Sequence, residues 1–216
     1  LMPPKMGLLS YVLEGFNPVE GRDVMFVPVA INYDRVLEDR VLIAANERGD
    51  RKFGGKVSVV FKFILRRTWH RICGKPFQFG TAAVTFGDPV SLRGYAETPS
   101  AEELAVDLMK RIEDVMPVVV VPLLSRVLLV GDLAADEVGL ISALNAQIIN
   151  TMDETMSVPA DQLSEVANQA LLQLEERQIV ERLTDTWRVL PESEAVLRFY
   201  ANSIAHYYPE NDAAAE

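Results

Sequence analysis

Two histidines and one cysteine limit the acid–base and nucleophilic chemistry that this chain of 216 residues could perform. His70 and Cys73 are three positions apart and would share one face of a helix. A nucleophilic pair also needs a third group that orients the base, and the spacing supplies none. His206 lies four positions after Asn202, and docking of a C-terminal helix onto the protein explains both residues. We therefore assign no catalytic residue and expect no metal site, since structural zinc sites need more Cys and His ligands.

Polar side chains that follow a short apolar strand form the second group of residues able to bind a ligand. Residues 24–31 (VMFVPVAI) are almost wholly apolar, which is typical of a strand buried on both faces of a parallel sheet. The polar residues that follow include Tyr33, Asp34, Arg35 and Glu38. Because α/β sheets place their sites at the carboxyl ends of strands, these side chains could form a polar binding cluster. A turn stabilised by an ion pair would explain the same residues.

The elements around this strand predict an α/β layer. Residues 6–16 place apolar side chains at helical spacing. Residues 79–86 (FGTAAVTF) predict a second strand that ends in a turn at residues 87–89. Residues 57–65 (VSVVFKFIL) predict a further apolar element, with a helix favoured over a strand. A strand, helix, strand order of this kind is typical of an α/β sheet.

The character of the sequence changes near residue 99, so we predict two domains, residues 1–98 and 99–216. Ser100 can cap a helix, and Glu103 stands at the position of a capping box. Residues 117–131 (PVVVVPLLSRVLLVG) are apolar, but a membrane-spanning helix needs roughly 20 residues. They therefore predict a buried core helix or an interfacial segment.

The remaining part of the chain is acidic and mostly helical. Helices are predicted over residues 137–151, 157–178 and 192–207, with a small hairpin over residues 179–190. Helix, helix, hairpin is the outline of a winged-helix module. A DNA-binding version needs a basic recognition helix, whereas residues 161–178 (DQLSEVANQALLQLEERQ) are acidic. We therefore expect a winged-helix-like extension with a structural or protein-binding role.

Charge is distributed unevenly along the chain. The net charge of −10 combines +4 over residues 1–100 with −14 over residues 101–216. Residues 51–75 carry eight Lys and Arg side chains and no acidic residue. Such a segment attracts phosphates, acidic carrier proteins or anionic lipid headgroups, although a solvated basic face would have the same composition. Nucleic acid is not expected as a partner, because the acidic half would repel it.

Four segments, in order along the chain, resemble segments of the glycerol-3-phosphate acyltransferase family. Residues 26–38 (FVPVAINYDRVLE) resemble the fourth conserved block of these enzymes, with Pro28 at the position of its proline. The other three segments are residues 4–10 (PKMGLLS), 79–92 (FGTAAVTFGDPVSL) and 197–208 (LRFYANSIAHYY). They resemble, in turn, the family's P-K-x-G-x-L segment, its G-x-x-x-V-x-F-G-x-P strand and turn, and its Y-A-N-S-I-x-H ending. The resemblance implies the C-terminal portion of a glycerolipid acyltransferase α/β domain, followed by the helical extension.

The resemblance also implies a role in phospholipid biosynthesis, at the cytoplasmic face of the inner membrane, with peripheral or monotopic attachment. Enzymes of this family transfer an acyl group from acyl-CoA or acyl carrier protein to glycerol 3-phosphate, without a further cofactor. Dihydroxyacetone phosphate as the acceptor is one alternative, and a non-catalytic protein-interaction module is another. The candidate substrate-binding residues, by their positions in the matching segments, are Lys5, Pro28, Tyr33 and Arg35.

The catalytic motif of that family is not found in this sequence. The family uses a His-x-x-x-x-Asp motif, in which the His is a general base and the Asp orients it. Lys75 stands five positions after His70, and Asn211 stands five positions after His206. The family's E-G-x-R-S-R block, which would precede Leu1, is absent too. We therefore expect the chain alone to be inactive.

Overall fold

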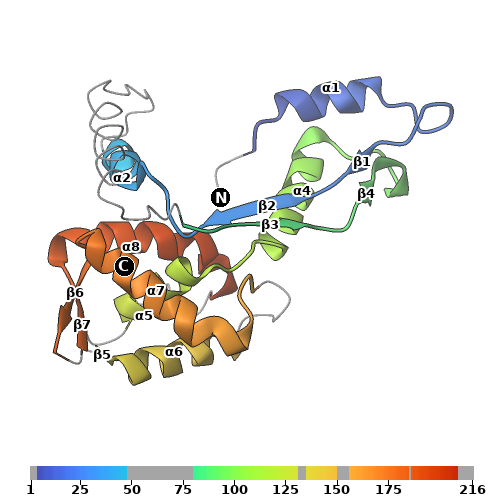
Figure 1. Ribbon diagram of the computed structural model, residues 1–216. Coiled ribbons are helices and arrows are strands. Elements are labelled where there is room, and N and C mark those ends of the chain that lie inside the picture. Colours follow the sequence, from blue (N-terminus) through green and yellow to red (C-terminus); the bar gives the residue numbers. More distant parts are fainter. Residues whose placement is uncertain (1–3, 48–79, 131–134, 150–155, 185, 209–216) are drawn as a thin grey trace, which may run out of the picture.

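The computed structural model describes residues 4–47, 80–130, 135–149, 156–184 and 186–208 (Figure 1). The expected element at residues 57–65, the basic segment 51–75 and the pair His70 and Cys73 lie outside the described residues. Helices and small sheets alternate along the rest of the chain, so the coarse α/β class is confirmed. No helix among the described residues is long and apolar enough to cross a membrane.

The N-terminal half is built around a long two-stranded ribbon. Its elements are α1 (Gly7–Gly15), β1 (Met25–Phe26), β2 (Val29–Tyr33), α2 (Asp39–Glu47), β3 (Ala82–Phe86) and β4 (Val90–Ser91). Strand β2 pairs antiparallel with β3, and β1 pairs antiparallel with β4. The prediction of a parallel sheet is therefore wrong. An apolar run shows that a strand is buried, but it does not show the direction of its neighbour.

Residues 87–89, predicted to form a turn, continue the ribbon instead. The Gly87 N–H donates a hydrogen bond of 2.8 Å to the Pro28 carbonyl, which links the two ladders. The registers place the three residues 87–89 opposite the two residues 27–28. The Gly-Asp-Pro sequence therefore accommodates one extra residue in a bulge and does not reverse the chain.

One face of the ribbon is covered, and the other is open. Ala30 and Asn32 of β2 are buried, whereas the alternate side chains of the ribbon are exposed. We call the exposed apolar set the open face; it consists of Val29, Ile31, Tyr33, Val84 and Phe86. In Figure 1 helices α5, α7 and α8 lie below the ribbon. The sequence predicted that both faces of the strand are buried. The described residues of the structure bury one of these faces.

The C-terminal half is mostly helical and contains a small sheet, and its first helix packs on α1 and β2 of the N-terminal half. Its elements are α4 (Ala101–Asp114), α5 (Val120–Val130), β5 (Ala135–Asp136), α6 (Glu137–Ile149), α7 (Leu163–Glu176), β6 (Val180–Leu183), β7 (Thr186–Val189), α8 (Glu194–Ala201) and the 3-10 helix η5 (Asn202–Tyr207). The capping box at Ser100 and Glu103 is confirmed, with both reciprocal hydrogen bonds present. The hairpin of β6 and β7 is confirmed as well, and β5 joins it in the strand order β5-β7-β6.

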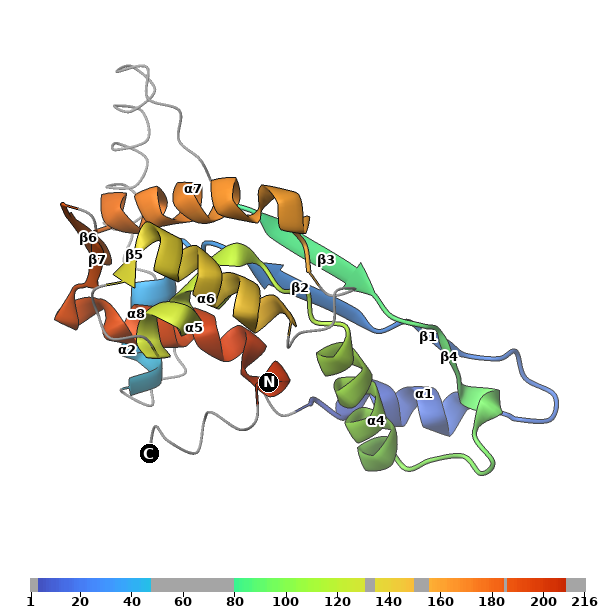
Figure 2. The ribbon, with the colours of Figure 1, turned by 90° about the horizontal axis from the view of Figure 1, so that it is seen from below.

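Helix α5 is the centre of the hydrophobic core. Every residue from Val120 to Leu128 is buried, and α6, α7 and α8 pack around this helix (Figure 2). Of the two predictions for residues 117–131, the buried core helix is confirmed. The interfacial segment is ruled out, because the apolar side chains of residues 118–128 contact the protein and not solvent.

Candidate functional site

The end of strand β2 is tied to the C-terminal tail by a buried amide. The Asn32 Nδ2 donates to the Pro117 carbonyl at 3.0 Å and to the Ser203 Oγ at 3.2 Å. Its Oδ1 accepts the N–H of Tyr33 at 2.9 Å. A buried amide left without partners would be costly, so these bonds specify where the tail docks. Two of the segments with family resemblance, residues 26–38 and 197–208, therefore lie against each other.

Asp34 lies at the start of the core helix. Its Oδ1 accepts the backbone N–H of Val121 at 3.0 Å, one of the N–H groups that a helix N-terminus leaves without an internal partner. Its own backbone N–H donates to the Thr81 carbonyl at 2.9 Å. Burial raises the pKa of the Asp34 carboxyl, although the hydrogen bonds from Val121 and Thr81 act in the opposite direction. Asp34 is thus a capping residue for α5, placed by the antiparallel ribbon.

Asp34 also lines a polar cavity of about 320 Å³ between the ribbon and two helices. Its wall includes Thr81, just before β3, Val121 of α5, and Gln169 and Gln173 of α7. The volume is at the lower end of the range for ligand pockets. A carboxylate on the wall makes the cavity unsuited to a phosphate group, because like charges repel.

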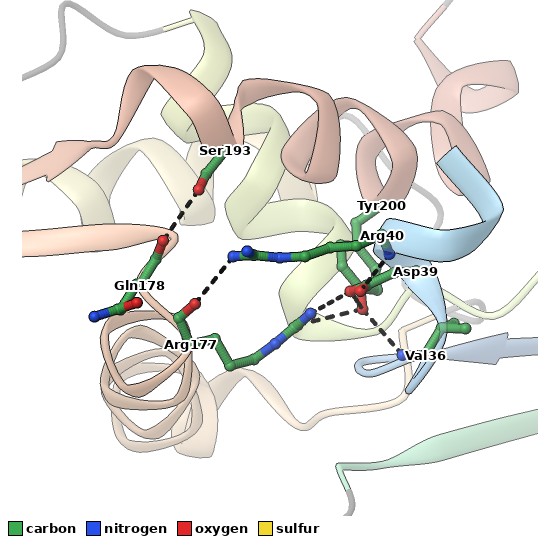
Figure 3. A network of polar contacts seen from close by, with 7 residues as sticks. All are labelled: Val36, Asp39, Arg40, Arg177, Gln178, Ser193 and Tyr200. Carbon is green, nitrogen blue, oxygen red and sulfur yellow. Dashed lines mark hydrogen bonds and ion pairs between the residues drawn. The ribbon is translucent and has the colours of Figure 1, made fainter. Parts of the chain in front are cut away.

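An ion pair between a buried carboxylate and a partly buried arginine lies five residues further along the chain, at Asp39 (Figure 3). Arg177, just after α7, donates from Nη2 to the Oδ2 of Asp39, the first residue of α2. The hydroxyl of Tyr200 on α8 donates to the same carboxylate oxygen at 2.7 Å. That hydroxyl also accepts the N–H of Val36 at 2.9 Å and the Nη1 of Arg177 at 3.3 Å. One hydroxyl therefore joins three elements that are far apart in the sequence.

The position of Arg177 depends on an unusual helix end. Gln178 has a positive φ of 56°, and the N–H of Ile179 donates back to the Leu174 carbonyl at 2.9 Å. This is the pattern of a Schellman C-cap, in which glycine usually occupies the left-handed position. Arg40 of α2 donates to the Arg177 carbonyl at 3.2 Å, and Ser193 donates to the Gln178 carbonyl at 3.0 Å. The helix end is thereby fixed to α2 and to the start of α8.

Arg35 is the only predicted substrate-binding residue near this network. Burial lowers the pKa of its guanidinium, and the positive charge of Arg177 lowers it further, while Glu176 and Asp39 oppose the shift. The backbone around it is close-packed, since a Cβ on Gly80, which has a positive φ of 84°, would lie 2.8 Å from the Arg35 Cβ. Arg35 therefore lies half-buried at the end of β2, within the influence of charges of both signs.

The other predicted residues have surroundings different from those of Arg35. Lys5 is an exposed side chain in the segment before α1, and Tyr33 belongs to the open face. Pro28 is buried, and its carbonyl accepts a hydrogen bond from the Gly87 N–H. The polar cluster proposed for Tyr33, Asp34, Arg35 and Glu38 does not form, because Asp34 faces α5 and Glu38 is exposed. The ion-paired turn offered as its alternative stays a prediction.

Several residues at this junction were not identified from the sequence. Asn32 is a polar residue in an apolar strand, which signals a buried hydrogen-bonded group, and Tyr200 lies inside the tail segment. No local pattern pairs Asp39 with Arg177, which are 138 positions apart. The docking role predicted for Asn202 and His206 holds in part, because His206 is half-buried and bonds to the backbone of Glu113 in α4, whereas Asn202 is exposed. Among the described residues no group of three or more His, Cys, Asp and Glu side chains could hold a metal ion.

Comparison with known proteins identifies the family. The model of the glycerol-3-phosphate acyltransferase C-terminal region matches residues 74–210, well over half of the chain. The chain belongs to this family. The dihydroxyacetone phosphate acyltransferase of Mus musculus is 39% identical over 95 residues, which are 44% of this chain and 13% of that protein. The glycerol-3-phosphate acyltransferase of Pseudomonas fluorescens is 32% identical over 100 residues, 45% of this chain and 11% of that protein.

These matches cover only a small part of the relatives, about an eighth of the length of the mouse protein and about a ninth of the length of the bacterial one. The matched family region contains the strand at residues 79–92 and the tail at residues 197–208. Residues 26–38 precede it, and yet their strand pairs with β3 and their Asn32 binds the tail. The acyltransferase family region and the segment before it are therefore packed as one unit.

Proposed function

We propose that this chain is part of an enzyme that transfers an acyl group from acyl-CoA or acyl carrier protein to glycerol 3-phosphate, a step of phospholipid biosynthesis. Family membership supports the acyl transfer, and the Pseudomonas relative supports the acceptor. The observation that carries the proposal is the packing of residues 26–38 against residues 79–92 and 197–208. Three segments that resemble the enzyme family converge on one junction, at the carboxyl end of β2.

Dihydroxyacetone phosphate is the second candidate acceptor. The relatives from Mus musculus, Oryctolagus cuniculus and Bos taurus, each 39% identical over 95 residues, are named for that substrate. The two acceptors differ by a ketone in place of a hydroxyl group, and both carry a phosphate. Competition between them in one assay separates the candidates.

Arg35 is the residue that we assign to the acceptor phosphate. Its guanidinium offers a planar fork of donors suited to phosphate oxygens, and it lies half-buried at the end of β2. We assign Tyr33 and Lys5 to the edges of the same site, and Pro28 to the shape of the strand. Lys5 and Tyr33 are exposed, so another part of the protein could form the rest of the site around them. Pro28 is buried next to β2.

The helical part from α5 to β7 is proposed to be a winged-helix-like module. The order α5, β5, α6, α7, β6, β7 with the antiparallel sheet order β5-β7-β6 supports this assignment. Helix α7, in the place of a recognition helix, carries Glu165, Glu175 and Glu176 and is unsuited to DNA. A structural or protein-binding role follows for this module, and we propose that the C-terminal domain as a whole begins near residue 99, with α4 as its first helix.

We propose that the enzyme works at the cytoplasmic surface of the inner membrane as a peripheral or monotopic protein. The basic segment at residues 51–75 supports this, because each Lys or Arg near an anionic surface adds about 1 kcal/mol of attraction. The acyl donor and the lipid product both favour such a location. Binding of the chain to anionic vesicles, and its loss at high salt, tests the proposal.

The catalytic base is proposed to come from outside this chain, since neither histidine has the required Asp partner. The test joins this chain to the part of the Pseudomonas fluorescens relative that precedes its matching segment. Acyl transfer is measured with labelled acyl-CoA and either acceptor. We expect activity in the joined protein and none in the 216-residue chain alone. Activity in the chain alone would contradict the assignment of the base.

The role of Arg35 is tested in the same joined protein. Arg35→Met should raise KM for the acceptor at least tenfold, about 1.4 kcal/mol of lost binding. Arg93→Met is the matched control, because Arg93 is exposed and bonds to the Gly21 carbonyl at the other end of the ribbon. Equal kinetics for the two variants would remove Arg35 from the site.

A further inference from the structure

Arg35 lies in a short loop between a strand and a helix. Strand β2 ends at Tyr33 and α2 begins at Asp39, so the loop consists of residues 34–38. Neither a helix nor a sheet ladder specifies the course of such a loop. The hydrogen bonds of its backbone N–H groups therefore decide where its side chains point. The direction of the Arg35 guanidinium depends on the groups that hold this backbone.

The backbone is held on each side of Arg35 by a contact from another element. The N–H of Asp34 donates to the Thr81 carbonyl at 2.9 Å, just before β3. The N–H of Val36 donates to the Tyr200 hydroxyl at 2.9 Å (Figure 3). The first contact comes from the ribbon itself. The second comes from α8, in the C-terminal half of the chain.

The hydroxyl of Tyr200 is a rigid anchor for the loop. A hydroxyl has one donor hydrogen and two acceptor lone pairs. Here the hydrogen goes to the Asp39 Oδ2 at 2.7 Å, and the lone pairs accept the Val36 N–H and the Nη1 of Arg177. All three positions are occupied, and Tyr200 is only 2% exposed, so the hydroxyl cannot turn without breaking a buried hydrogen bond.

We propose that Tyr200 is a positioning residue for Arg35, which it directs toward the acceptor phosphate through the N–H of Val36. The inference rests on the proposed function, which assigns Arg35 to that phosphate. A planar guanidinium forms two parallel bonds to a phosphate only when it is aligned with it, so a shift of the loop by about 1 Å weakens the interaction. Tyr200 belongs to the matched family region, residues 74–210, and Arg35 precedes it. The C-terminal region thus sets the acceptor affinity of a residue outside itself.

Amide hydrogen exchange in the 216-residue chain tests the anchor without any assay of activity. Tyr200→Phe keeps the ring and removes the hydroxyl, so the Val36 amide should exchange about tenfold faster or more. The Asp34 amide, bonded to the Thr81 carbonyl on the other side of Arg35, is the internal control and should change by less than about twofold. An unchanged rate for the Val36 amide would overturn the proposal.

Kinetics in the joined protein described above test the consequence for the acceptor. Tyr200→Phe should raise KM for glycerol 3-phosphate about tenfold and leave kcat and KM for acyl-CoA within about twofold, the pattern of lost acceptor binding. Leu144→Val is the control for a general loss of stability, because Leu144 is fully buried on α6, which packs on α5, α7 and β5. A rise in acceptor KM of equal size in both variants, or in neither, would refute the positioning role.

A double variant shows whether Tyr200 acts through Arg35. If it does, the acceptor KM of the Arg35→Met, Tyr200→Phe protein should equal that of Arg35→Met within about twofold. Multiplication of the two single effects would mean that Tyr200 acts independently, and it would overturn the proposal.

Failure of the proposed function gives a different result. No acyl transfer in the joined wild type, or an unchanged acceptor KM in Arg35→Met, refutes that function or its assignment of Arg35. The exchange rate of the Val36 amide then still decides whether Tyr200 holds the loop. A raised acceptor KM in Arg35→Met, together with an unchanged one in Tyr200→Phe, refutes only the positioning role.

Discussion

The side chains of Asn32 and Ser203, 171 residues apart, are joined by a hydrogen bond of 3.2 Å. Ser203 also donates to the Tyr200 carbonyl at 2.8 Å, so its hydroxyl orientation is specified by α8 itself. The bond therefore fixes the place where the C-terminal helix docks on the ribbon. It lies next to the Asp39–Arg177–Tyr200 network, and the two contacts together hold the end of β2 against the core.

Replacing Asn32 by leucine should destabilise the protein. The Pro117 carbonyl and the Ser203 hydroxyl would lose a donor in a buried place, at a cost of roughly 1–3 kcal/mol. Urea unfolding followed by circular dichroism measures the change. Ile31→Leu, one position away but on the open face, should change the free energy of unfolding by less than about 0.5 kcal/mol. Equal effects of the two variants would contradict the role of the amide.

Removing Arg177 should cost more than removing any exposed arginine. Arg177→Met leaves the buried Asp39 carboxylate without its cation, which is expected to cost about 3–5 kcal/mol. Asp39→Asn in the Arg177→Met background should recover part of that loss. The matched control is Arg198→Met, which breaks an exposed pair with Glu194 on α8 and should cost about 0.5 kcal/mol or less. Thermal and urea unfolding of the wild type, the two single variants and the double variant gives these free energies.

Asp34 predicts a specific change in the pH dependence of stability. Because burial raises the pKa of its carboxyl in the folded state, the folded protein binds the proton more tightly than the unfolded chain. This contribution is fully present below the unfolded pKa, near 3.9, and is lost as the pH rises through the folded pKa. Asp34→Asn keeps an oxygen acceptor for the Val121 N–H and removes the titration.

The variant should therefore gain stability relative to the wild type as the pH rises from 4 through the raised pKa of Asp34. Urea unfolding midpoints of both proteins, measured every half pH unit, give this difference directly. A constant difference between the two proteins across that range would show that the carboxyl does not titrate with a raised pKa.

Gln178 offers a stabilising substitution. The residue has a left-handed backbone, which costs a side chain roughly 1 kcal/mol and costs glycine little. Gln178→Gly should raise the free energy of unfolding by up to about that amount. Gln169→Gly in the middle of α7 is the opposite control, since glycine in a helix interior loses about 1 kcal/mol. Two changes of the same sign would contradict the C-cap assignment.

Local elements were the part of the fold that could be predicted. The capping box at Ser100, the core helix α5 and the β6–β7 hairpin all follow from residues within a few positions of one another. The predictions that failed concern relations between elements. The apolar run at residues 24–31 predicted a buried strand. It specifies neither the antiparallel direction of β3 nor the bulge at residues 87–89.

The same division holds for the candidate site. The sequence by itself determined the family segments, the uneven charge and the lack of a His-x-x-x-x-Asp motif, because these depend on residue types at fixed spacing. Only the tertiary structure decided which side chains meet. Asp34 caps α5, Arg35 lies near Arg177, and Asp39 binds Arg177 across 138 positions. Burial and ion pairing depend on distances in space, and a chain of this length can bring together residues that no local pattern relates.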